Sequence, residues 1–221
     1  MLERDPDLAR RVRDNREFVT KVAGRAAERG VVQFIDLGAG LPARPSVHEA
    51  ARAVSPLASV VYVDNDPVVI SHAQALLVTG AGLAAMAGDL RDPGAVLSDP
   101  VLGGVIDFSQ PVCVILAAVA HFLPAAQAAE LAARYMAPLA AGSWLAVSCA
   151  YFTDEELLAQ LYAMHTAAPF QNHGAGELAS FLGGLDVLPP GIAEVRRWLS
   201  GTGGTPTGRS AYMLCGVGVK G

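Results

Sequence analysis

Apolar residues in this chain are grouped in short continuous runs rather than in one repeating stripe. Runs of this length that are rich in valine, isoleucine and aromatic residues are typical of strands buried on both faces of a sheet. We therefore expect strands at residues 31–37, 59–64, 83–89, 111–117, 143–149, 185–188 and 212–219.

Helical spacing and helix-start signals lie between most of these runs. Pro67 fits the first turn of a helix, and Thr153 with Glu156 three residues later forms a capping-box pattern. Helices are expected at residues 7–29, from 46 to before Pro56, 67–77, 93–102, 124–136, 153–167 and 176–182. Strands that alternate with helices give a parallel sheet covered on both faces.

The end of the chain departs from this alternation. The last two predicted strands have no long helix between them, so they pair most easily as antiparallel neighbours. Five βα units with such an ending have the order of a class I methyltransferase sheet. The predicted fold is thus a three-layer, Rossmann-like α/β fold with seven mostly parallel strands and an antiparallel C-terminal strand.

Length and composition favour one packed domain. At 221 residues with 52% hydrophobic and 17% charged residues, the chain is expected to fold as one domain. We divide residues 1–221 into an N-terminal helical segment (1–30), a cofactor-binding half (31–150) and a substrate-side half (151–221).

Charge and cysteine content limit the partners. The net charge of -5 argues against a nucleic-acid partner, and the arginines near the N-terminus fit the solvated face of a helix. Three cysteines far apart in the sequence suggest neither a disulfide framework nor a metal site. No signal peptide or membrane span is visible, so a cytoplasmic protein is expected. The expected partners are a small-molecule acceptor and, as one option, a second copy of the chain in a homodimer.

The first predicted strand ends in a glycine turn that indicates a nucleotide site. Gly38, Ala39 and Gly40 follow a buried strand and precede a helix, so bare backbone N–H groups can face a ligand. Two ligands fit. Gly38, Gly40 and Ala43, with Asp64 placed 24 residues after Gly40, are compatible with a dinucleotide fingerprint.

Other features favour S-adenosylmethionine. Asp36 precedes the glycines, where it can meet the cationic ammonium group of a methionine moiety. Pro42 and Pro45 interrupt the smooth entry into a helix that a pyrophosphate needs. Asp89, after the third strand, offers a carboxylate to the adenine amino group, although it fits ordinary loop chemistry equally well.

The predicted cofactor contacts follow from this choice. A carboxylate at the end of the second strand is a good acceptor for two ribose hydroxyls, and we assign this role to Asp64. The residues expected at the cofactor are Asp36, Gly38, Ala39, Gly40, Asp64, Asn65, Gly88, Asp89 and Leu90.

Blocks of the sequence resemble a known family. The blocks at 33–42 (Gln-Phe-Ile-Asp-Leu-Gly-Ala-Gly-Leu-Pro) and 60–69, which contains Tyr-Val-Asp-Asn-Asp-Pro, together with Asn15-Arg16-x-Phe18, resemble the S-adenosyl methyltransferase family of actinobacteria, whose substrates are undefined. The resemblance covers nearly the whole chain. It implies methyl transfer from S-adenosylmethionine, with S-adenosylhomocysteine as product, to an acceptor that is expected to be a small molecule.

Candidate acceptor-side residues lie near the ends of the fourth and fifth strands. His121 is the candidate general base, although a helix-entry histidine satisfied by the backbone is an equally good interpretation. Asn15, Arg16, Phe122 and Tyr151 are expected in the substrate pocket. No Asn-Pro-Pro-Tyr-like motif follows the fourth strand, so the pattern expected for amide or adenine N-methylation is missing.

Two alternatives stay open at this point. Family members carry a further segment before the Asn-Arg stretch that this sequence lacks, which motivates a cofactor-binding protein without catalysis. A nicotinamide-dependent reductase ranks below both, because of Asp36 and the two prolines.

Overall fold

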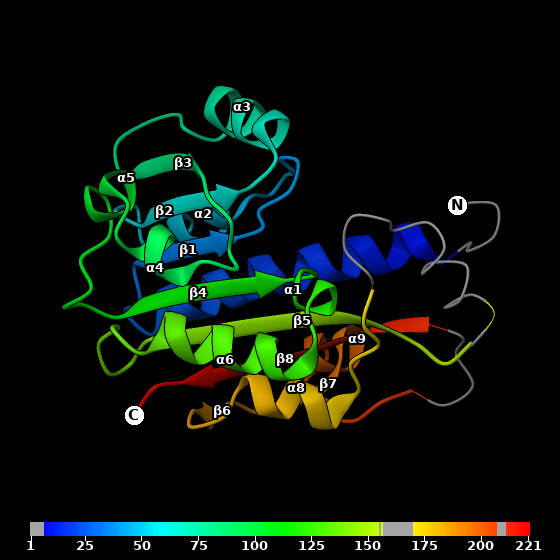
Figure 1. The fold of residues 1–221 in the computed structure, drawn as a ribbon. Coiled ribbons are helices and arrows are strands. Elements are labelled where there is room, and N and C mark those ends of the chain that lie inside the picture. The colour runs from blue at the N-terminus through cyan, green and yellow to red at the C-terminus, as the bar shows by residue number, and fades with distance from the viewer. Residues whose placement is uncertain (1–6, 155, 157–169, 207–210) are drawn as a thin grey trace.

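One mixed sheet runs through the protein, and its strands lie where the apolar runs of the sequence are (Figure 1). The computed structural model describes residues 7–154, 156, 170–206 and 211–221. The strands are β1 (Gln33–Leu37), β2 (Ser59–Asp64), β3 (Leu83–Ala87), β4 (Val112–Ala117), β5 (Trp144–Phe152), β6 (Asp186–Val187), β7 (Ala193–Glu194) and β8 (Ala211–Val219).

The strand order confirms the expected class I arrangement. In the described part of the chain the order is β3-β2-β1-β4-β5-β8-β6, with β1 to β5 parallel and β8 antiparallel to β5. The predicted strand at 185–188 contracts to the two residues of β6. Both β6 and β7 pair with β8, at Val219 and Cys215 respectively, so two short strands share its outer edge.

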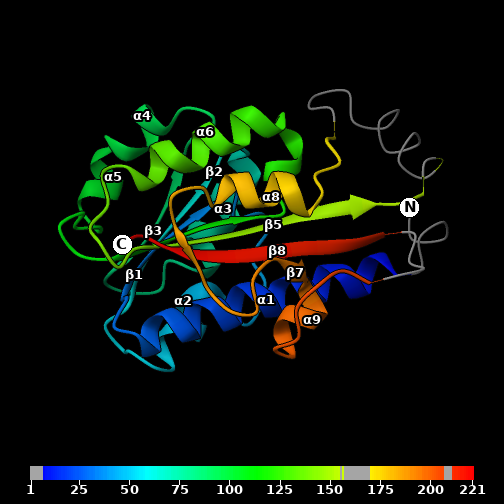
Figure 2. The same ribbon diagram turned by 90° about the horizontal axis from the view of Figure 1, so that it is seen from below.

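Helices cover both faces of the sheet (Figure 2). The helices α1, α2 and α9 lie on one face, and α4, α5, α6 and α8 lie on the other. Helix α3 packs against β2 and β3 at the edge of the sheet. The described helices are α1 (Leu8–Glu28), α2 (Val47–Arg52), α3 (Pro67–Leu76), α4 (Pro93–Leu97), α5 (Pro100–Gly103), η1 (Ala120–Phe122), α6 (Ala125–Met136), α8 (Ala175–Phe181) and α9 (Val195–Leu199).

Local sequence signals explain where several helices begin. Ser46 and Glu49 form a capping box at α2, and the Asp66 carboxylate accepts the Val68 N–H at the start of α3. The predicted helix at 93–102 is interrupted, because Asp99 caps a new helix by accepting the Val101 N–H. The helix predicted at 153–167 lies almost entirely outside the described residues.

The strands are apolar throughout because both of their faces are buried. Along β4, Val112, Val114 and Leu116 belong to the core under α6, while Cys113 and Ile115 belong to the core under α1. This two-sided burial erases the polar–apolar alternation that a half-exposed strand would show. The fifth strand is longer than expected and continues to Phe152, so Tyr151 is part of the sheet.

Candidate cofactor site

A cavity of about 290 Å³ lies at the carboxyl end of β1, on the α1 side of the sheet. Its walls come from α1, the end of β1, the loop that follows it, β2 and the loop after β4. The residues that line it include Asn15, Arg16, Asp36, Gly38, Ala39, Gly40, Pro42, Pro45, Ser46, Tyr62, Ala118 and Val119. Ligands of open α/β sheets bind outside the carboxyl ends of the strands, so this is the expected place for one.

The glycine turn has a backbone that favours glycine. Gly38 and Gly40 have φ angles of 71° and 64°, a region that residues with a side chain rarely adopt. A Cβ atom at Gly38 would lie 2.4 Å from Cγ1 of Val119, whereas nothing lies within 4 Å at Gly40. Gly38 therefore makes room for the loop after β4, and Gly40 is required only for its backbone conformation.

Asp64 ties the end of β2 to this turn. Its Oδ2 accepts the Gly40 N–H at 2.9 Å, and its Oδ1 accepts the Asp66 N–H at 3.0 Å. The side chain is buried, and each carboxylate oxygen keeps further acceptor capacity. The adjacent Asn65 is exposed in the turn. The ribose role of Asp64 stays a prediction, and its fixed position beside Gly40 supports it.

Asp36 is a buried carboxyl group in the wall of the cavity. Burial raises its pKa to about 7, and the charge of Asp64 adds to this shift. Among the described residues, no hydrogen bond to the Asp36 side chain offsets its burial. A carboxyl group in this condition is stabilised in its charged form by a nearby cation. Asp36 is therefore well placed to meet a cationic ligand group.

A polar cluster lies behind Asp36 and was not predicted as part of the site. Tyr62 is the neighbour of Asp36 across β1 and β2, and its hydroxyl lies 2.9 Å from Nδ1 of His48. The same nitrogen lies 3.1 Å from Oγ of Ser46. Burial lowers the pKa of His48, which favours a neutral ring. His48 thus has a structural role, because it links Tyr62 and Ser46 in the cavity wall.

The residues expected near adenine lie at the end of β3. Leu90 sits beside the glycine turn, with its Cδ2 3.5 Å from the position of a Cβ at Gly38, and the Gly88 N–H donates to the Asp64 carbonyl. The Asp89 carboxylate is held by Arg91 at 2.5 to 3.0 Å, and this bond lowers its pKa. The adenine role of Asp89 stays a prediction.

Helix α1 brings Asn15 and Arg16 into the wall of the cavity that Asp36 also lines, and their substrate-pocket role stays a prediction. Oδ1 of Asn15 accepts the Ser148 hydroxyl at 2.6 Å, and Oγ of Ser148 accepts the Ala118 N–H at 3.1 Å. Ala118 has a φ of 57°, which is uncommon for a residue with a side chain. The chain of hydrogen bonds thus joins α1, β5 and the loop after β4.

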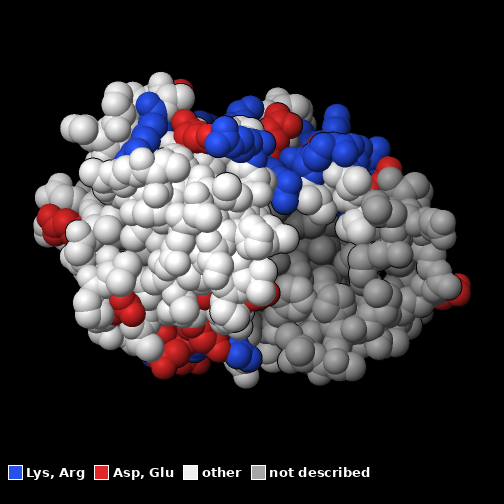
Figure 3. Space-filling view, turned by 90° about the horizontal axis from the view of Figure 1, so that it is seen from above, with Lys and Arg blue, Asp and Glu red and all other residues white. Residues whose placement is uncertain are grey.

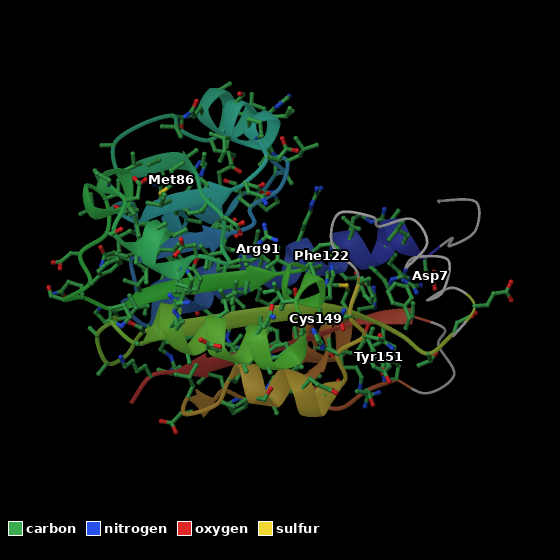
Figure 4. The ribbon with its side chains drawn as sticks, viewed as in Figure 1. Asp7, Met86, Arg91, Phe122, Cys149 and Tyr151 are labelled. Carbon is green, nitrogen blue, oxygen red and sulfur yellow. The ribbon has the colours of Figure 1, made fainter. Side chains whose placement is uncertain are left out.

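His121, Phe122 and Tyr151 form part of a second region, at the ends of β4 and β5. The labelled Phe122 and Tyr151 lie in this area in Figure 4, and none of the three lines the cavity. His121 is buried, and its ring lies 4.5 Å from Phe122 and 4.9 Å from Phe170, between ring centroids. Tyr151 pairs with Tyr212 at 5.2 Å.

The hydrogen bonding of His121 limits its chemistry. Nδ1 accepts the Ala150 N–H at 3.3 Å, so in the neutral ring the hydrogen is on Nε2. To take a proton at Nδ1, His121 would have to release this backbone group. The general-base role stays a prediction.

Sequence reasoning missed two residues that line the cavity, Tyr62 and Ala118, and Ser148, which bonds to Asn15 of its wall. From the sequence alone, Tyr62 is indistinguishable from the apolar residues of its strand. Ser148 is likewise indistinguishable from a polar residue of the core in β5. Ala118 carries no signal for its positive φ. The alternation of β2 could have identified Tyr62, because in parallel pairing it lies opposite Asp36 and on the same face.

The described residues form neither a metal site nor a membrane-spanning helix. In the described ranges, no cluster of three or more His, Cys, Asp or Glu side chains could hold a metal ion. None of the described helices has the length and hydrophobicity needed to cross a membrane.

Comparison with solved structures places this architecture among methyltransferases. The chain matches a DUF574 family protein from Streptomyces avermitilis MA-4680 with a TM-score of 0.87 and 30% identity, covering 100% of this chain and 87% of the other. It matches a protein from Thermobifida fusca YX, described as "a putative methyltransferase", with the same TM-score and 28% identity over 99% and 85% of the two chains.

More distant structures share the fold and contain the cofactor or its product. Human N-acetylserotonin methyltransferase in complex with S-adenosylmethionine has a TM-score of 0.50 at 18% identity, over 90% of this chain and 52% of that one. Magnesium protoporphyrin IX methyltransferase from Synechocystis, with bound S-adenosylhomocysteine, has a TM-score of 0.54 at 15% identity, over 94% and 84%.

The sequence comparisons complete the assignment. A search of curated proteins finds no match. The sequence model described as S-adenosyl methyltransferase matches residues 1–221, from the first residue to the last. Together with the class I sheet and the glycine turn between Asp36 and Asp64, this match shows that the chain belongs to the S-adenosyl methyltransferase family.

Proposed function

We propose that this protein transfers the methyl group of S-adenosylmethionine to a small-molecule acceptor in the cytoplasm. Membership of the family identifies the cofactor as S-adenosylmethionine. The glycine pattern alone also allowed a nicotinamide dinucleotide. The observation that carries the proposal is the separation of a cavity with one acidic and one basic side chain, at β1 and β2, from an aromatic cluster at the ends of β4 and β5.

The residues of the cavity fit the cofactor. Gly38 and Gly40 keep the turn free of side chains beside the cavity, and a cationic ligand group would stabilise the charged form of the buried Asp36 carboxyl in its wall. Asp36 and Asp64 would hold the cofactor, with Leu90 and the glycine turn beside it. The expected bare N–H groups of the turn are not found, because Gly38 and Ala39 donate to the Val63 carbonyl and Gly40 donates to Asp64. The turn would therefore allow close approach of the cofactor rather than donate hydrogen bonds from these groups. When bound, S-adenosylmethionine supplies an electrophilic methyl group on a cationic sulfur.

The aromatic cluster supports a small acceptor with an apolar part. His121, Phe122, Phe152 and Phe170 bring their rings within 4.5 to 5.3 Å of one another along a chain of contacts. Apolar surfaces with a few polar groups are typical of small-molecule sites. The net charge of -5 supports the same class, because a nucleic-acid backbone would meet an acidic protein.

In this reaction the protein would orient the acceptor relative to the cofactor and would exclude water from the site. Methyl transfer by in-line attack needs alignment of the acceptor atom with the sulfonium, and alignment alone supplies a large share of the rate. Nδ1 of His121 accepts the Ala150 N–H, so His121 would take the acceptor proton at this nitrogen only after releasing Ala150.

Methyl transfer can be tested with an acceptor mixture. The purified protein is incubated with S-adenosylmethionine labelled in the methyl group and with an actinobacterial extract, separated into a small-molecule filtrate, protein and RNA. We expect label in the filtrate, and the Asp64→Ala variant as control should label it far more weakly at the same cofactor concentration.

The other outcomes identify the alternatives. Label confined to the protein or RNA fraction would overturn the small-molecule proposal. Absence of transfer to every fraction, by a protein that binds S-adenosylhomocysteine, would instead support a cofactor-binding protein without catalysis.

A further inference from the structure

The cavity wall carries one charged side chain of each sign. Among the described residues that line the cavity, Asp36 is the acidic side chain and Arg16 is the basic one. They come from different elements, β1 and α1. The amino-acid end of S-adenosylmethionine carries one ammonium and one carboxylate group, so it needs one partner of each sign.

Arg16 is available for an anionic group. Its side chain is exposed, and within the described ranges it makes no ion pair, unlike Arg10 and Arg196 of the same face, which pair with Asp7 and Asp14. Basic side chains gather along the α1 side of the molecule in Figure 3. A guanidinium group can bind a carboxylate through two parallel hydrogen bonds.

The side-chain amide of the neighbouring Asn15 is also oriented so that it can donate to an anionic group. Because Oγ of Ser148 already accepts the Ala118 N–H, its own hydrogen is directed to Oδ1 of Asn15. This bond fixes which side of the amide is the acceptor. The amide nitrogen, with two hydrogens to donate, is the other end of the group.

From these contacts we propose that Arg16 and Asn15 bind the carboxylate of the cofactor's methionine moiety, opposite Asp36 at the ammonium group. The two residues then belong to the cofactor site and not to the acceptor pocket in which the sequence placed them. This inference rests on the use of S-adenosylmethionine and does not require the proposed acceptor class.

The test compares two ligands that differ only in this carboxylate. Binding of S-adenosylhomocysteine and of its decarboxylated analogue is measured by isothermal titration calorimetry, without any acceptor. Loss of a charge-assisted hydrogen-bonded pair should weaken S-adenosylhomocysteine binding to Arg16→Gln by about 10- to 100-fold. The analogue should bind this variant and the wild type alike.

Asn15→Asp gives a second, independent variant. It keeps an acceptor for the Ser148 hydroxyl, so the link between α1 and β5 is retained. It replaces the donor with a negative charge, which should repel the carboxylate and lower S-adenosylhomocysteine affinity by about tenfold or more. Affinity for the cationic analogue should stay equal or rise.

The matched control is Arg13→Gln, since Arg13 is an exposed arginine of the same helix outside the cavity. It should bind both ligands as the wild type does. Unchanged S-adenosylhomocysteine affinity in Arg16→Gln would overturn the proposal, and so would an equal loss for both ligands. Failure of methyl transfer with these binding differences intact would reject the acceptor proposal alone.

Discussion

The carboxyl ends of β1 and β2 and those of β4 and β5 lie along one edge of the same sheet but differ in how their polar groups are satisfied. At β1, the Asp36 carboxyl is buried in the wall of an open cavity, and burial raises its pKa to about 7. At β4, His121 is buried too, yet its Nδ1 accepts the Ala150 N–H and its ring lies against Phe122 and Phe170.

This difference separates ligand binding from packing. The first region keeps a carboxyl group that is more stable in its charged form with a cation nearby, so it depends on a ligand. The second region is already bonded within the protein and presents mostly aromatic surface. We therefore expect substitutions in the first region to change cofactor affinity, and substitutions in the second to change turnover.

The largest loss is expected from Gly38→Ala. The residue would have a φ of 71° and its Cβ would lie 2.4 Å from Val119 Cγ1, so strain and overlap should together destabilise the fold by about 3 kcal/mol. Binding of S-adenosylhomocysteine should be lost with it. Thermal unfolding and calorimetry measure the two effects.

Gly40→Ala is the matched control, because its φ is 64° but no atom lies within 4 Å of a Cβ there. Only the backbone strain remains, so the loss should be about 1 kcal/mol. Adding Val119→Ala to Gly38→Ala should recover the part of the lost stability that the overlap with Val119 causes. Equal losses at the two glycines would refute the close approach of Val119.

A loss of about 100-fold in S-adenosylhomocysteine affinity is expected for Asp64→Ala. The substitution removes the predicted ribose acceptor and also frees the Gly40 and Asp66 N–H groups. Asp89→Ala should cost less than about tenfold, since that carboxylate is already held by Arg91. A larger loss at Asp89 than at Asp64 would reverse the two assignments.

Asp36→Asn is expected to separate stability from binding. With a pKa raised from 3.8 to about 7, Asp36 retains a proton in the native state that the unfolded chain has released, so stability falls as pH rises from about 4 to 7. The full penalty applies above pH 7, where this shift corresponds to at most about 4 kcal/mol. We expect about half of this destabilisation, because the cavity that Asp36 lines is open to water.

The variant should therefore be more stable than the wild type at pH 8 and equal to it near pH 4, in urea titrations at both values. Its affinity for S-adenosylhomocysteine should nevertheless be lower, because the ammonium group loses its carboxylate. In the wild type this affinity should decrease as pH falls below about 7, as Asp36 takes up its proton. A flat pH profile for the wild type would contradict the assignment of Asp36.

The smallest effect on cofactor affinity is expected at His121. His121→Gln should bind S-adenosylhomocysteine within about twofold of the wild type, while methyl transfer falls by about 100-fold if the imidazole acts on the acceptor. Phe122→Leu serves as a control for packing in the same region. A large loss of cofactor affinity in His121→Gln would show that the two regions are not separate.

The sequence by itself determined the fold and the centre of the site. Its apolar runs, helix caps and glycine turn act locally, within a few residues, so they identify strands, helix starts and the backbone of the turn without further information. Asp36, Gly38, Gly40 and Asp64 could be predicted because each lies at a strand end next to such a signal.

Only the tertiary structure decided which distant residues complete that site. Asn15 and Ser148 are 133 residues apart, and no local pattern predicts the bond between them. The same holds for Val119 against Gly38. These contacts depend on strand register and on how α1 lies across the sheet, which are set by the packing of the whole core rather than by neighbouring residues.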